Sequence, residues 1–439
     1  MTTKSIPVPD QLTTQLKQKS RSKWVASYAK AQILKRLKHL KVGRLTILDG
    51  DERYDFGSTF PINQDSIKTT ITVNDPRFYG EIAFGGSIGA GEAYMLGYWS
   101  ADNLTEVIRL MCLNQSVMDA LEGGYEWLTK PLMKTLHWLN SNTAEGSRKN
   151  IAAHYDLGND MFSLFLDTTM MYSSAIFASE TSTLLDASNL KLKTICDKLD
   201  LKATDHVVEI GTGWGGFAIY AAIHYGCKIT TTTISKQQYE LAKSRVQSAG
   251  LEDQITLLLE DYRDLTGTFD KLVSIEMVEA VGHQYYDTYF AKVGALLKPN
   301  GLALIQAITI ADQRYESAKS SVDFIQRYIF PGSCIPSVTA MTSSITKVSD
   351  LRLTDLEDIG PHYATTLRVW RENFFENVAG IRQLGYSEEF IKMWEFYLCY
   401  CEGGFEERAL GDVHLLLAKP ENRRAAFKPT APHAITICG

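Results

Sequence analysis

A glycine-rich stretch near the middle of the chain, Glu209-Ile210-Gly211-Thr212-Gly213-Trp214-Gly215-Gly216, carries the residues most suited to chemistry. It follows the apolar pair Val207-Val208 and leads into the Ala-rich segment 217–223, a pattern that predicts a strand, a tight turn and a helix. Glycines allow positive φ and a close approach of the backbone to a ligand. The free N–H groups of a helix N-terminus bind anionic or polar ligand atoms. The stretch therefore predicts a site for a nucleotide-like cofactor.

Three interpretations of this glycine turn stay open from the motif itself. The glycines at positions 211, 213 and 216 match the dinucleotide-binding fingerprint formally. Glu209, two residues before the first glycine, makes the stretch resemble S-adenosylmethionine methyltransferases more closely. The third interpretation is a glycine-rich turn in an unrelated α/β domain, because short motifs often match by chance.

The segments around the turn predict the sheet that must position it. Apolar runs with β-branched residues predict strands at 207–210, 228–235, 255–259, 269–275, 301–308 and 413–417. Helical patterns occur at 189–199, 217–223, 236–250 and 285–297. This alternation predicts an α/β fold with a parallel, doubly wound sheet, which binds its ligands at the carboxyl ends of its strands.

Length and composition limit the class of protein. The 439 residues, 45% of them apolar, suffice for two or three structural units. No apolar run approaches a membrane span of about 18–20 residues, and residues 1–18 lack the apolar region of a signal peptide, so we expect a cytoplasmic protein. Seven scattered cysteines are expected to be free thiols. We interpret the close pair Cys399 and Cys401 as core residues and predict no metal site.

The net charge of −6 conceals a basic segment near the N-terminus. Residues 17–44 contain ten Lys and Arg and no Asp or Glu, which predicts an anionic partner. Residues 24–40 show helical spacing of apolar side chains, which suits an anionic membrane surface. These apolar residues are Trp24, Tyr28, Ala31, Leu34 and Leu37. The alternative is a helix whose apolar stripe packs on its own domain. Nucleic acid is disfavoured, because the chain lacks the aromatic-and-glycine pattern of an RNA-binding sheet.

The chain divides into segments of different character. We predict a flexible tail at 1–16, a small N-terminal α+β domain at 17–122, a linker at 123–147, the cofactor-binding domain at 148–420 and a tail at 421–439. In the small domain we expect strands at 44–48 and 69–73, a glycine turn within 88–99 that serves domain packing, and a helix at 104–113.

Residues 312–402 lack the strand and helix alternation and predict a helical, aromatic-rich insertion. Its aromatic residues include Phe324, Tyr328, Phe330, Tyr363, Trp370, Phe374 and Trp394. Aromatic side chains are usually core. So many before the last strand would suit a lid lined for an apolar substrate or a cation.

Seven blocks of sequence, taken in order, resemble the cyclopropane fatty acid synthases and the related mycolic acid cyclopropane synthases. They are Ala153-His154-Tyr155-Asp156-Leu157-Gly158-Asn159-Asp160, Tyr172-Ser173, the glycine turn 209–216, Thr233-Ile234-Ser235-Lys236-Gln237-Gln238, Tyr262-Arg263-Asp264-Leu265, Glu279-Ala280-Val281-Gly282 and Tyr328-Ile329-Phe330-Pro331. The resemblance covers about residues 147–420. Residues 89–99 also resemble the small N-terminal domain of the bacterial members that act on phospholipids.

The resemblance implies a Rossmann-like class I methyltransferase fold and S-adenosylmethionine as cofactor. It also implies methyl transfer to a cis double bond of an acyl chain, usually in a membrane phospholipid. An alkene is a poor nucleophile, so catalysis depends on positioning. Aromatic faces can stabilise the resulting carbocation, and a base must then remove a proton so that the ring closes. The resemblance implies a bound bicarbonate ion as this base.

The resemblance assigns ten residues to the cofactor. Tyr172 and Ser173 would hold the methionine end, and Gly211, Gly213 and Trp214 would form the cradle. Thr233, Ile234 and Gln238 would contact the ribose region, and Asp261 and Tyr262 would flank the adenine.

The bicarbonate site of the family consists of a Cys, a Glu, a His, an Ile and a Tyr. The matching residues here are Ser174, Glu279, Gln306, Ile308 and Tyr363, so the Cys and the His are replaced. Ser and Gln can still hydrogen-bond an oxyanion, but Gln cannot titrate as His does.

Glu276 is a further departure, because it stands where the family usually has Gly in a Ser-x-Gly-x-x-Glu block. At the end of the fourth strand its carboxylate could reach the cofactor's ammonium group or the cation, or act as a base itself. The alternative is a solvent-facing or salt-bridged Glu.

The sequence leaves three functions to compare. The first is a cyclopropane fatty acid synthase that is cytoplasmic and peripherally associated with the inner face of the membrane. The second performs the same methyl transfer but loses a different proton, giving a methylene- or methyl-branched chain; Ser174, Gln306 and Glu276 keep it open. The third, a catalytically silent lipid-binding protein, is disfavoured because the cofactor glycines and Glu279 are present. The sequence is compatible with a homodimer.

Overall fold

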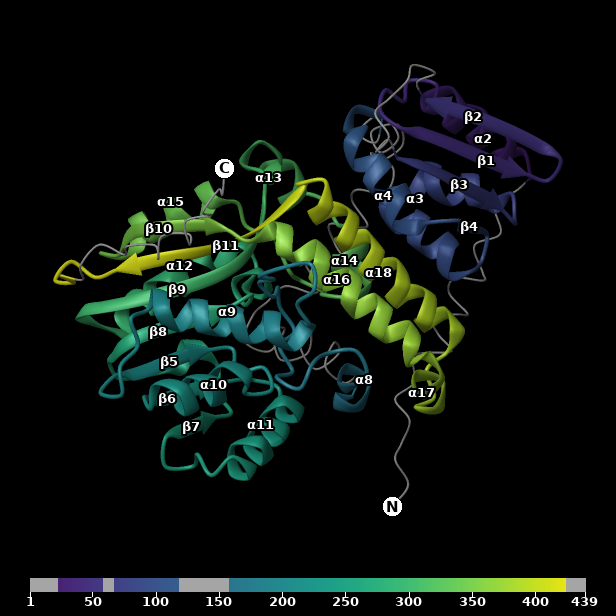
Figure 1. The fold of residues 1–439 in the computed structure, drawn as a ribbon. Helices are drawn as coiled ribbons and strands as arrows, with labels where there is room; N and C mark the ends of the chain where they lie inside the picture. The colour runs from purple at the N-terminus through teal and green to yellow at the C-terminus, as the bar shows by residue number, and fades with distance from the viewer. Residues whose placement is uncertain (1–22, 58–66, 118–157, 424–439) are drawn as a thin grey trace, which may run out of the picture.

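The computed structural model describes residues 23–57, 67–117 and 158–423, which form two units (Figure 1). The N-terminal unit contains a four-stranded sheet and the C-terminal unit a seven-stranded sheet. The predicted tail at 1–16 and linker at 123–147 lie outside the described residues, as does most of the predicted tail at 421–439. The domain boundaries therefore stay predictions.

The N-terminal unit is an α+β unit with strand order β2-β1-β3-β4. Its elements are α2 (Lys23–Leu37), β1 (Arg44–Asp49), β2 (Glu52–Gly57), β3 (Lys68–Val73), α3 (Arg77–Met95), β4 (Trp99–Ala101) and α4 (Leu104–Leu113). Strand β1 pairs antiparallel with β2 and parallel with β3. The predicted strands at 44–48 and 69–73 and the helix at 104–113 are confirmed, and Asn103 begins α4 by accepting a hydrogen bond from the Glu106 amide.

The predicted glycine turn within 88–99 is confirmed at Gly97, where φ is +72°, and is wrong at Gly89 and Gly91, because α3 continues to Met95. The backbone departs from helical angles earlier, at Gly86. The later glycines instead allow a close approach between the two units: a Cβ on Gly91 would lie 2.4 Å from the ring of Phe324. The expected role in domain packing is confirmed.

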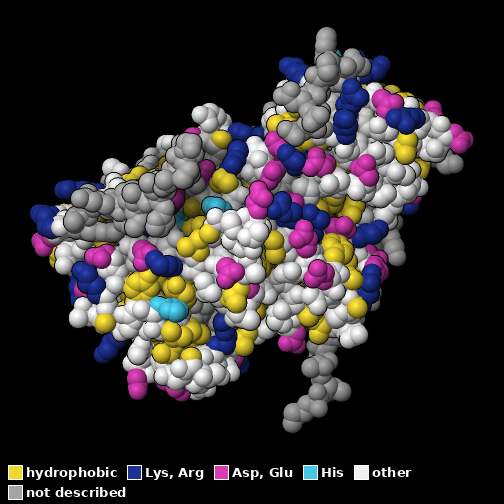
Figure 2. All heavy atoms as spheres, in the orientation of Figure 1, with side chains coloured by type: hydrophobic (Ala, Val, Ile, Leu, Met, Phe, Trp, Pro, Cys, Tyr) yellow, Lys and Arg dark blue, Asp and Glu magenta, His cyan; other side chains and the backbone are white. Residues whose placement is uncertain are grey.

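Helix α2 buries a face that overlaps the predicted one only at Leu37 and, in part, at Leu34. Ala29, Ile33 and Leu37 are buried, whereas Tyr28 is 47% exposed. The three buried residues have helical spacing, as the predicted stripe does. Helix α2 packs on α3 of its own unit, which agrees with the alternative interpretation. Lys30 forms ion pairs with Asp49 and Glu52, and Figure 2 shows basic side chains of this unit lying among acidic ones. The apolar stripe of α2 is therefore occupied internally.

The C-terminal unit is built on a seven-stranded sheet in the order β10-β11-β9-β8-β5-β6-β7. Its strands are β5 (His206–Ile210), β6 (Lys228–Thr232), β7 (Ile255–Leu258), β8 (Phe269–Ile275), β9 (Leu297–Ile310), β10 (Arg352–Asp358) and β11 (Leu410–Ala418). The strands from β7 to β9 are parallel, and β11 is antiparallel to both of its neighbours. Figure 1 shows helices on both faces of this sheet. The helices outside the insertion are α8 (Asn159–Ser163), α9 (Leu184–Lys198), α10 (Gly216–Tyr225), α11 (Lys236–Ser248) and α12 (Tyr286–Ala295). The predicted doubly wound sheet is confirmed, with one antiparallel strand added.

The predicted insertion is mostly helical, but the expectation that it lacks strands is wrong. Its helices are α13 (Asp312–Lys319), α14 (Phe324–Tyr328), α15 (Val338–Val348), α16 (Gly360–Glu376), α17 (Val378–Gln383) and α18 (Glu388–Glu406). Strand β10 lies among them and forms the sheet edge beside β11, with every residue exposed. Its apolar residues lack the alternation of a half-buried strand, which explains why the pattern failed.

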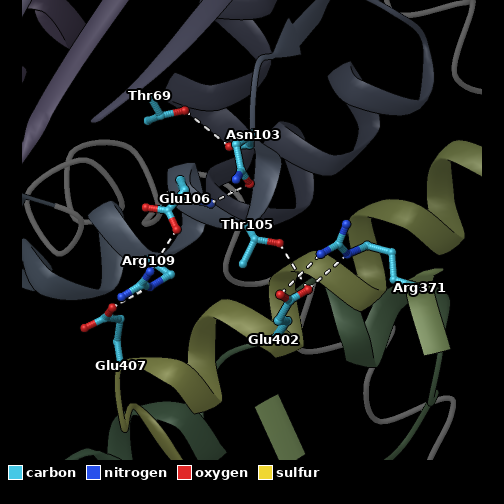
Figure 3. Close-up of polar contacts among 8 residues, drawn as sticks. All are labelled: Thr69, Asn103, Thr105, Glu106, Arg109, Arg371, Glu402 and Glu407. Carbon is cyan, nitrogen blue, oxygen red and sulfur yellow. Dashed lines mark hydrogen bonds and ion pairs between the residues drawn. The ribbon is translucent and has the colours of Figure 1, made fainter. Parts of the chain in front are cut away.

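Polar contacts join α4 of the N-terminal unit to α16 and α18 of the C-terminal unit (Figure 3). The Glu402 side chain, buried to 6% exposure, accepts a hydrogen bond of 3.2 Å from the Thr105 hydroxyl. It also pairs with Arg371 at 3.0 Å. Arg109 of α4 pairs with Glu407 at 2.6 Å. In residues 23–57, 67–117 and 158–423, no helix has both the length and the apolar character of a membrane span.

Candidate functional site

A cavity of about 770 Å³ opens at the carboxyl ends of the parallel strands, a volume within the usual range for ligand sites. All ten residues assigned to the cofactor line it, as do four of the assigned catalytic residues, Glu276, Glu279, Ile308 and Tyr363. From this polar end an apolar arm continues into the N-terminal unit, lined by Ile33, Leu37, Leu45, Ile71, Phe78 and Val107. The cavity thus combines a cofactor-like end with a long apolar space.

The glycine turn forms one wall of the cavity. Gly211, Gly213 and Gly215 have φ values of +99°, +52° and +85°, a region that favours glycine. The amides of Gly211 and Thr212 donate to the Thr232 carbonyl at 3.1 and 3.0 Å, which ties the turn to β6. A Cβ on Gly211 would lie 3.1 Å from Met277 Cγ. The turn is therefore shaped for a ligand that contacts the backbone directly.

Several of the other assigned cofactor residues are held in place by contacts within the protein. The Thr233 hydroxyl donates to Gln238 at 2.9 Å, and the Asp261 carboxylate is fixed by Arg263 at 2.6 Å. The Tyr172 ring stacks on Trp370 with centroids 5.2 Å apart. These groups present hydroxyl, amide and aromatic surfaces of the kinds that the ribose, adenine and methionine parts of S-adenosylmethionine require. The residues present fit this cofactor.

Glu276 lies at the centre of the assigned catalytic residues. Its Oε1 accepts hydrogen bonds from the Ser174 amide at 2.7 Å and from Gln306 Nε2 at 2.8 Å. Its Oε2 accepts a hydrogen bond of 2.6 Å from the Tyr363 hydroxyl. Burial raises the pKa of Glu276, while these donors and Lys191 oppose the shift. The alternative of a solvent-facing Glu276 is wrong.

Ser174 and Gln306 lie behind Glu276 rather than at the cavity wall. Both are 0% exposed. The Ser174 hydroxyl donates to the Ala175 carbonyl at 3.1 Å, so only its backbone amide reaches the Glu276 carboxylate. The two residues thus contact the carboxylate of the chain itself.

Asp412 and His414 belong to the same cluster, although sequence reasoning did not assign them a role. Gln306 Nε2 donates to Asp412 at 2.9 Å as well as to Glu276, so its amide joins the two carboxyl groups, and Asp412 Oδ1 has no partner among the described residues. Burial, followed by the charge of Glu276, raises the pKa of Asp412 well above its usual range. His414 pairs with Gln306 across β9 and β11. The available signal was a charged residue at the start of a buried strand.

Glu279 is a second buried carboxyl group at the cavity. Its Oε1 accepts a hydrogen bond from the Ile308 amide, and its buried Oε2 has no partner among the described residues. Burial and the charge of Glu276 raise the pKa of Glu279 to about 8. The free oxygen makes Glu279 available to a bound ligand.

Two further buried charges lie below the cofactor wall. Lys191 Nζ donates to the Ser173 hydroxyl at 2.7 Å, and burial lowers the pKa of this lysine to about 8. The Glu209 carboxylate accepts from the Thr231 hydroxyl at 2.6 Å, and burial raises the pKa of Glu209 to about 8. Sequence reasoning missed Lys191, because nothing in an amphipathic helix pattern distinguishes it. The described residues contain no cluster of His, Cys, Asp and Glu suited to a metal ion.

The raised pKa of Glu209 predicts a specific pH dependence of stability. Between its ordinary value of 4.5 and about 8, the unfolded chain loses the Glu209 proton while the folded chain retains it, so stability falls as pH rises. The substitution Glu209→Gln removes this titration. The unfolding free energy of the wild type, measured by urea denaturation relative to E209Q, should fall between pH 5.5 and 7.5 by up to about 1.4 kcal/mol per unit. A difference that stays constant over this range would contradict the prediction.

Comparisons with known proteins bear on the family and the fold of the chain. A family model described as mycolic acid cyclopropane synthetase matches residues 142–415. A tuberculostearic acid methyltransferase of Mycobacterium tuberculosis is 41% identical over 338 residues, 75% of this chain and 78% of that protein. A cyclopropane-fatty-acyl-phospholipid synthase of Escherichia coli (strain K12) is 38% identical over 346 residues, 78% of this chain and 86% of that protein. A solved mycolic acid cyclopropane synthase, complexed with S-adenosylhomocysteine and CTAB, has a TM-score of 0.57 at 27% identity and covers 62% of this chain and 98% of its own. These matches confirm the predicted class I methyltransferase fold.

Proposed function

The chain belongs to the mycolic acid cyclopropane synthetase family, and from this premise we propose that it converts cis-unsaturated acyl chains of membrane phospholipids into cyclopropane fatty acids. The chain is an S-adenosylmethionine-dependent lipid methyltransferase, as its family and its relatives indicate. The third predicted function, a catalytically silent lipid-binding protein, is thereby set aside.

The observation that carries the proposal is the continuous cavity. Its polar end contains every residue assigned to the cofactor, and its apolar arm reaches the interior of the N-terminal unit. An acyl chain requires a long space without charged groups, and a methyl donor requires a cradle at one end of that space. The cavity provides both, and Glu276, Glu279 and Tyr363 also line it.

The residues of the chain have distinct roles in this proposal. S-adenosylmethionine, when bound, supplies the methyl group to the alkene. Gly211 and Gly213 let the backbone approach the cofactor closely. The rings of Phe330 and Tyr363 line the cavity and could stabilise a positive charge formed there. Burial of this end of the cavity keeps water from the cation.

Product analysis tests the proposal. The purified protein would be incubated with phospholipid vesicles containing cis-monounsaturated chains and with methyl-labelled S-adenosylmethionine. We expect lipid that is heavier by one CH₂ and that shows cyclopropane protons by NMR. The same vesicles with fully saturated chains provide the control, which should take up no label. Absence of labelled lipid from unsaturated vesicles would sink the proposal.

A second product is favoured by a specific observation, the presence of Glu276 at the cavity. A base that differs in kind from the one the resemblance implies can remove a different proton from the same cation, which would give a methylene- or methyl-branched chain. The relative from Mycobacterium tuberculosis is named as a methyltransferase without reference to a ring. In the same NMR experiment, terminal methylene signals without cyclopropane protons would identify this product.

The substitution Tyr363→Phe should lower kcat by about 10- to 100-fold. It removes the hydroxyl that donates to Glu276 at 2.6 Å, and hydrogen bonds to charged groups contribute about 1.5–3 kcal/mol. The ring that packs on Phe405 is retained. Initial rates of lipid methylation would measure the effect.

Tyr94→Phe is the matched control for this prediction. Tyr94 also donates to a carboxylate, that of Glu395 at 2.8 Å, but it does not line the cavity. Its kcat should stay within about twofold of the wild type. Equal rates for Y363F and the wild type would mean that the Tyr363 hydroxyl has no part in the reaction.

We also propose that the protein works in the cytoplasm at the inner face of an anionic membrane, with residues 17–44 as the contact. Support comes from the exposed side chains of Lys35, Lys38 and Lys41. Replacing these three lysines with glutamine should weaken binding to vesicles containing phosphatidylglycerol, by about 1 kcal/mol for each charge. Affinity for S-adenosylmethionine should not change. Vesicle flotation that is equal for variant and wild type would contradict this proposal.

A further inference from the structure

We propose that the carboxylate of Glu276, paired with a protonated Asp412, is the general base of this enzyme and takes the place of a bound bicarbonate ion. The inference rests on the proposed methyl transfer to an alkene. It assigns the last proton transfer to a side chain of the chain itself.

The hydrogen-bond donors around Glu276 already have an acceptor. Three groups near the assigned bicarbonate residues, the Ser174 amide, Gln306 Nε2 and the Tyr363 hydroxyl, already donate to the two oxygens of Glu276. A carboxylate and a bicarbonate ion have the same planar pair of oxygens, so they compete for the same donors. With Glu276 in place, an ion cannot bind these three groups as well.

Glu276 has a left-handed backbone conformation. Its φ is +48°, a region that costs a non-glycine residue about 1–2 kcal/mol. Such strain persists where surrounding contacts hold the residue, and it is concentrated at functional sites. Here the Glu276 amide donates to the Gln306 carbonyl at 2.8 Å, and the side chain accepts the three bonds given above. The left-handed backbone aims the carboxylate at the donors beside the cavity.

The carboxyl groups of Asp412 and Glu276 differ in their surroundings, and this difference decides which of them carries a proton. Asp412 lies deeper, does not line the cavity, and meets the charge of Glu276. Glu276 has the three donors and the nearby Lys191, all of which favour its ionised form. The proton is therefore assigned to Asp412, because Gln306 donates to both carboxyl groups and only Glu276 accepts further hydrogen bonds, from the Ser174 amide and the Tyr363 hydroxyl. The group that lines the cavity is the ionised one, as a base must be.

The proton transfer balances without another reactant. After methyl transfer, the substrate carries one positive charge on the former alkene carbon next to the one that received the methyl group. A C–H bond of the added methyl breaks, and its electron pair forms the second C–C bond of the cyclopropane. The proton forms an O–H bond with Glu276. The positive charge of the cation and the negative charge of the carboxylate are both removed in this step.

Bicarbonate dependence tests the assignment. Wild type, Glu276→Gln and Glu276→Gly would be assayed in CO₂-free buffer and with added bicarbonate. We expect wild-type turnover to be equal in both buffers, and E276Q to lose about 100- to 10,000-fold in both. E276G should lose a similar factor in CO₂-free buffer and regain at least tenfold with bicarbonate, because glycine vacates the donors and relieves the backbone strain.

A binding measurement gives a readout that does not depend on turnover. ¹³C NMR of labelled bicarbonate, without cofactor, should show binding to E276G and none to the wild type. Circular dichroism and S-adenosylmethionine affinity would confirm that each variant is folded. Asp412→Asn replaces a neutral carboxyl group by a neutral amide, so its turnover is expected to fall by a smaller factor than that of E276Q.

Several outcomes would overturn the inference. These are bicarbonate-dependent turnover of the wild type, E276Q turnover within tenfold of wild type, and E276G that neither binds bicarbonate nor regains turnover. A loss in D412N as large as that in E276Q would place the working charge on Asp412 instead. Failure of the proposed function is distinct from all of these, because the wild type would then yield no methylated lipid in either buffer.

Discussion

The substitution Gly211→Ala is expected to weaken the binding of S-adenosylmethionine by at least about 100-fold, equivalent to about 2.7 kcal/mol. Gly211 has a φ of +99°, and its backbone forms the wall of the cavity where the cofactor is assigned. A Cβ there adds strain and removes the space in which the ligand approaches the main chain. Isothermal titration calorimetry with the purified variant measures the affinity.

Gly267→Ala is the matched control for this substitution. Gly267 has nearly the same backbone angle, φ +95°, and a Cβ there would meet only the Phe269 ring at 3.8 Å. It does not line the cavity. Both variants should lose thermal stability to a similar extent, and only G211A should lose cofactor affinity. Equal affinities for the two variants would show that the glycine turn does not contact the cofactor.

Arg371→Met should destabilise the protein by about 3 kcal/mol. The substitution leaves the Glu402 carboxylate, 6% exposed, without its cationic partner between the two units (Figure 3). Removing one partner of a buried ion pair is far more damaging than removing both. Urea denaturation would measure the loss, and the double variant Arg371→Met/Glu402→Gln should recover part of it.

The control for this prediction is Arg382→Met. Arg382 and Glu388 form the same two-bond contact, at 2.6 and 3.0 Å, on the surface of the molecule. Exposed ion pairs contribute little to stability, so this variant should unfold close to the wild type. A loss in R382M equal to that in R371M would mean that the burial of Glu402 is not what matters.

The sequence predicted the parts of the fold that follow from periodicity. The strands from β5 to β9 and the glycine turn came from local patterns, and their order placed the cofactor residues at one edge. Strand β10 did not follow, because its exposed residues carry no hydrophobic alternation. Helix α2 had two helical apolar stripes, and only tertiary packing on α3 decides which one is buried.

The sequence predicted many residues of the candidate site but not the contacts between them. Resemblance brought Ser174, Glu276 and Gln306 together, and the structure places all three in one cluster. It did not indicate that Ser174 contributes its amide rather than its hydroxyl, since that depends on the direction of the backbone. Asp412 and Lys191 were missed because burial of a charge is visible only once neighbouring elements are packed around it.

The left-handed backbone of Glu276 bears on how such a site can arise during evolution. A glycine adopts this conformation freely, so exchanging Gly for Glu requires no change in the path of the main chain. Codons for the two amino acids differ at a single base. A side chain introduced by that one mutation would find its three donors already arranged around the carboxylate position. One mutation would then separate an enzyme that needs bicarbonate as its base from one that does not. Selection could favour the second enzyme in cells where dissolved CO₂ is scarce.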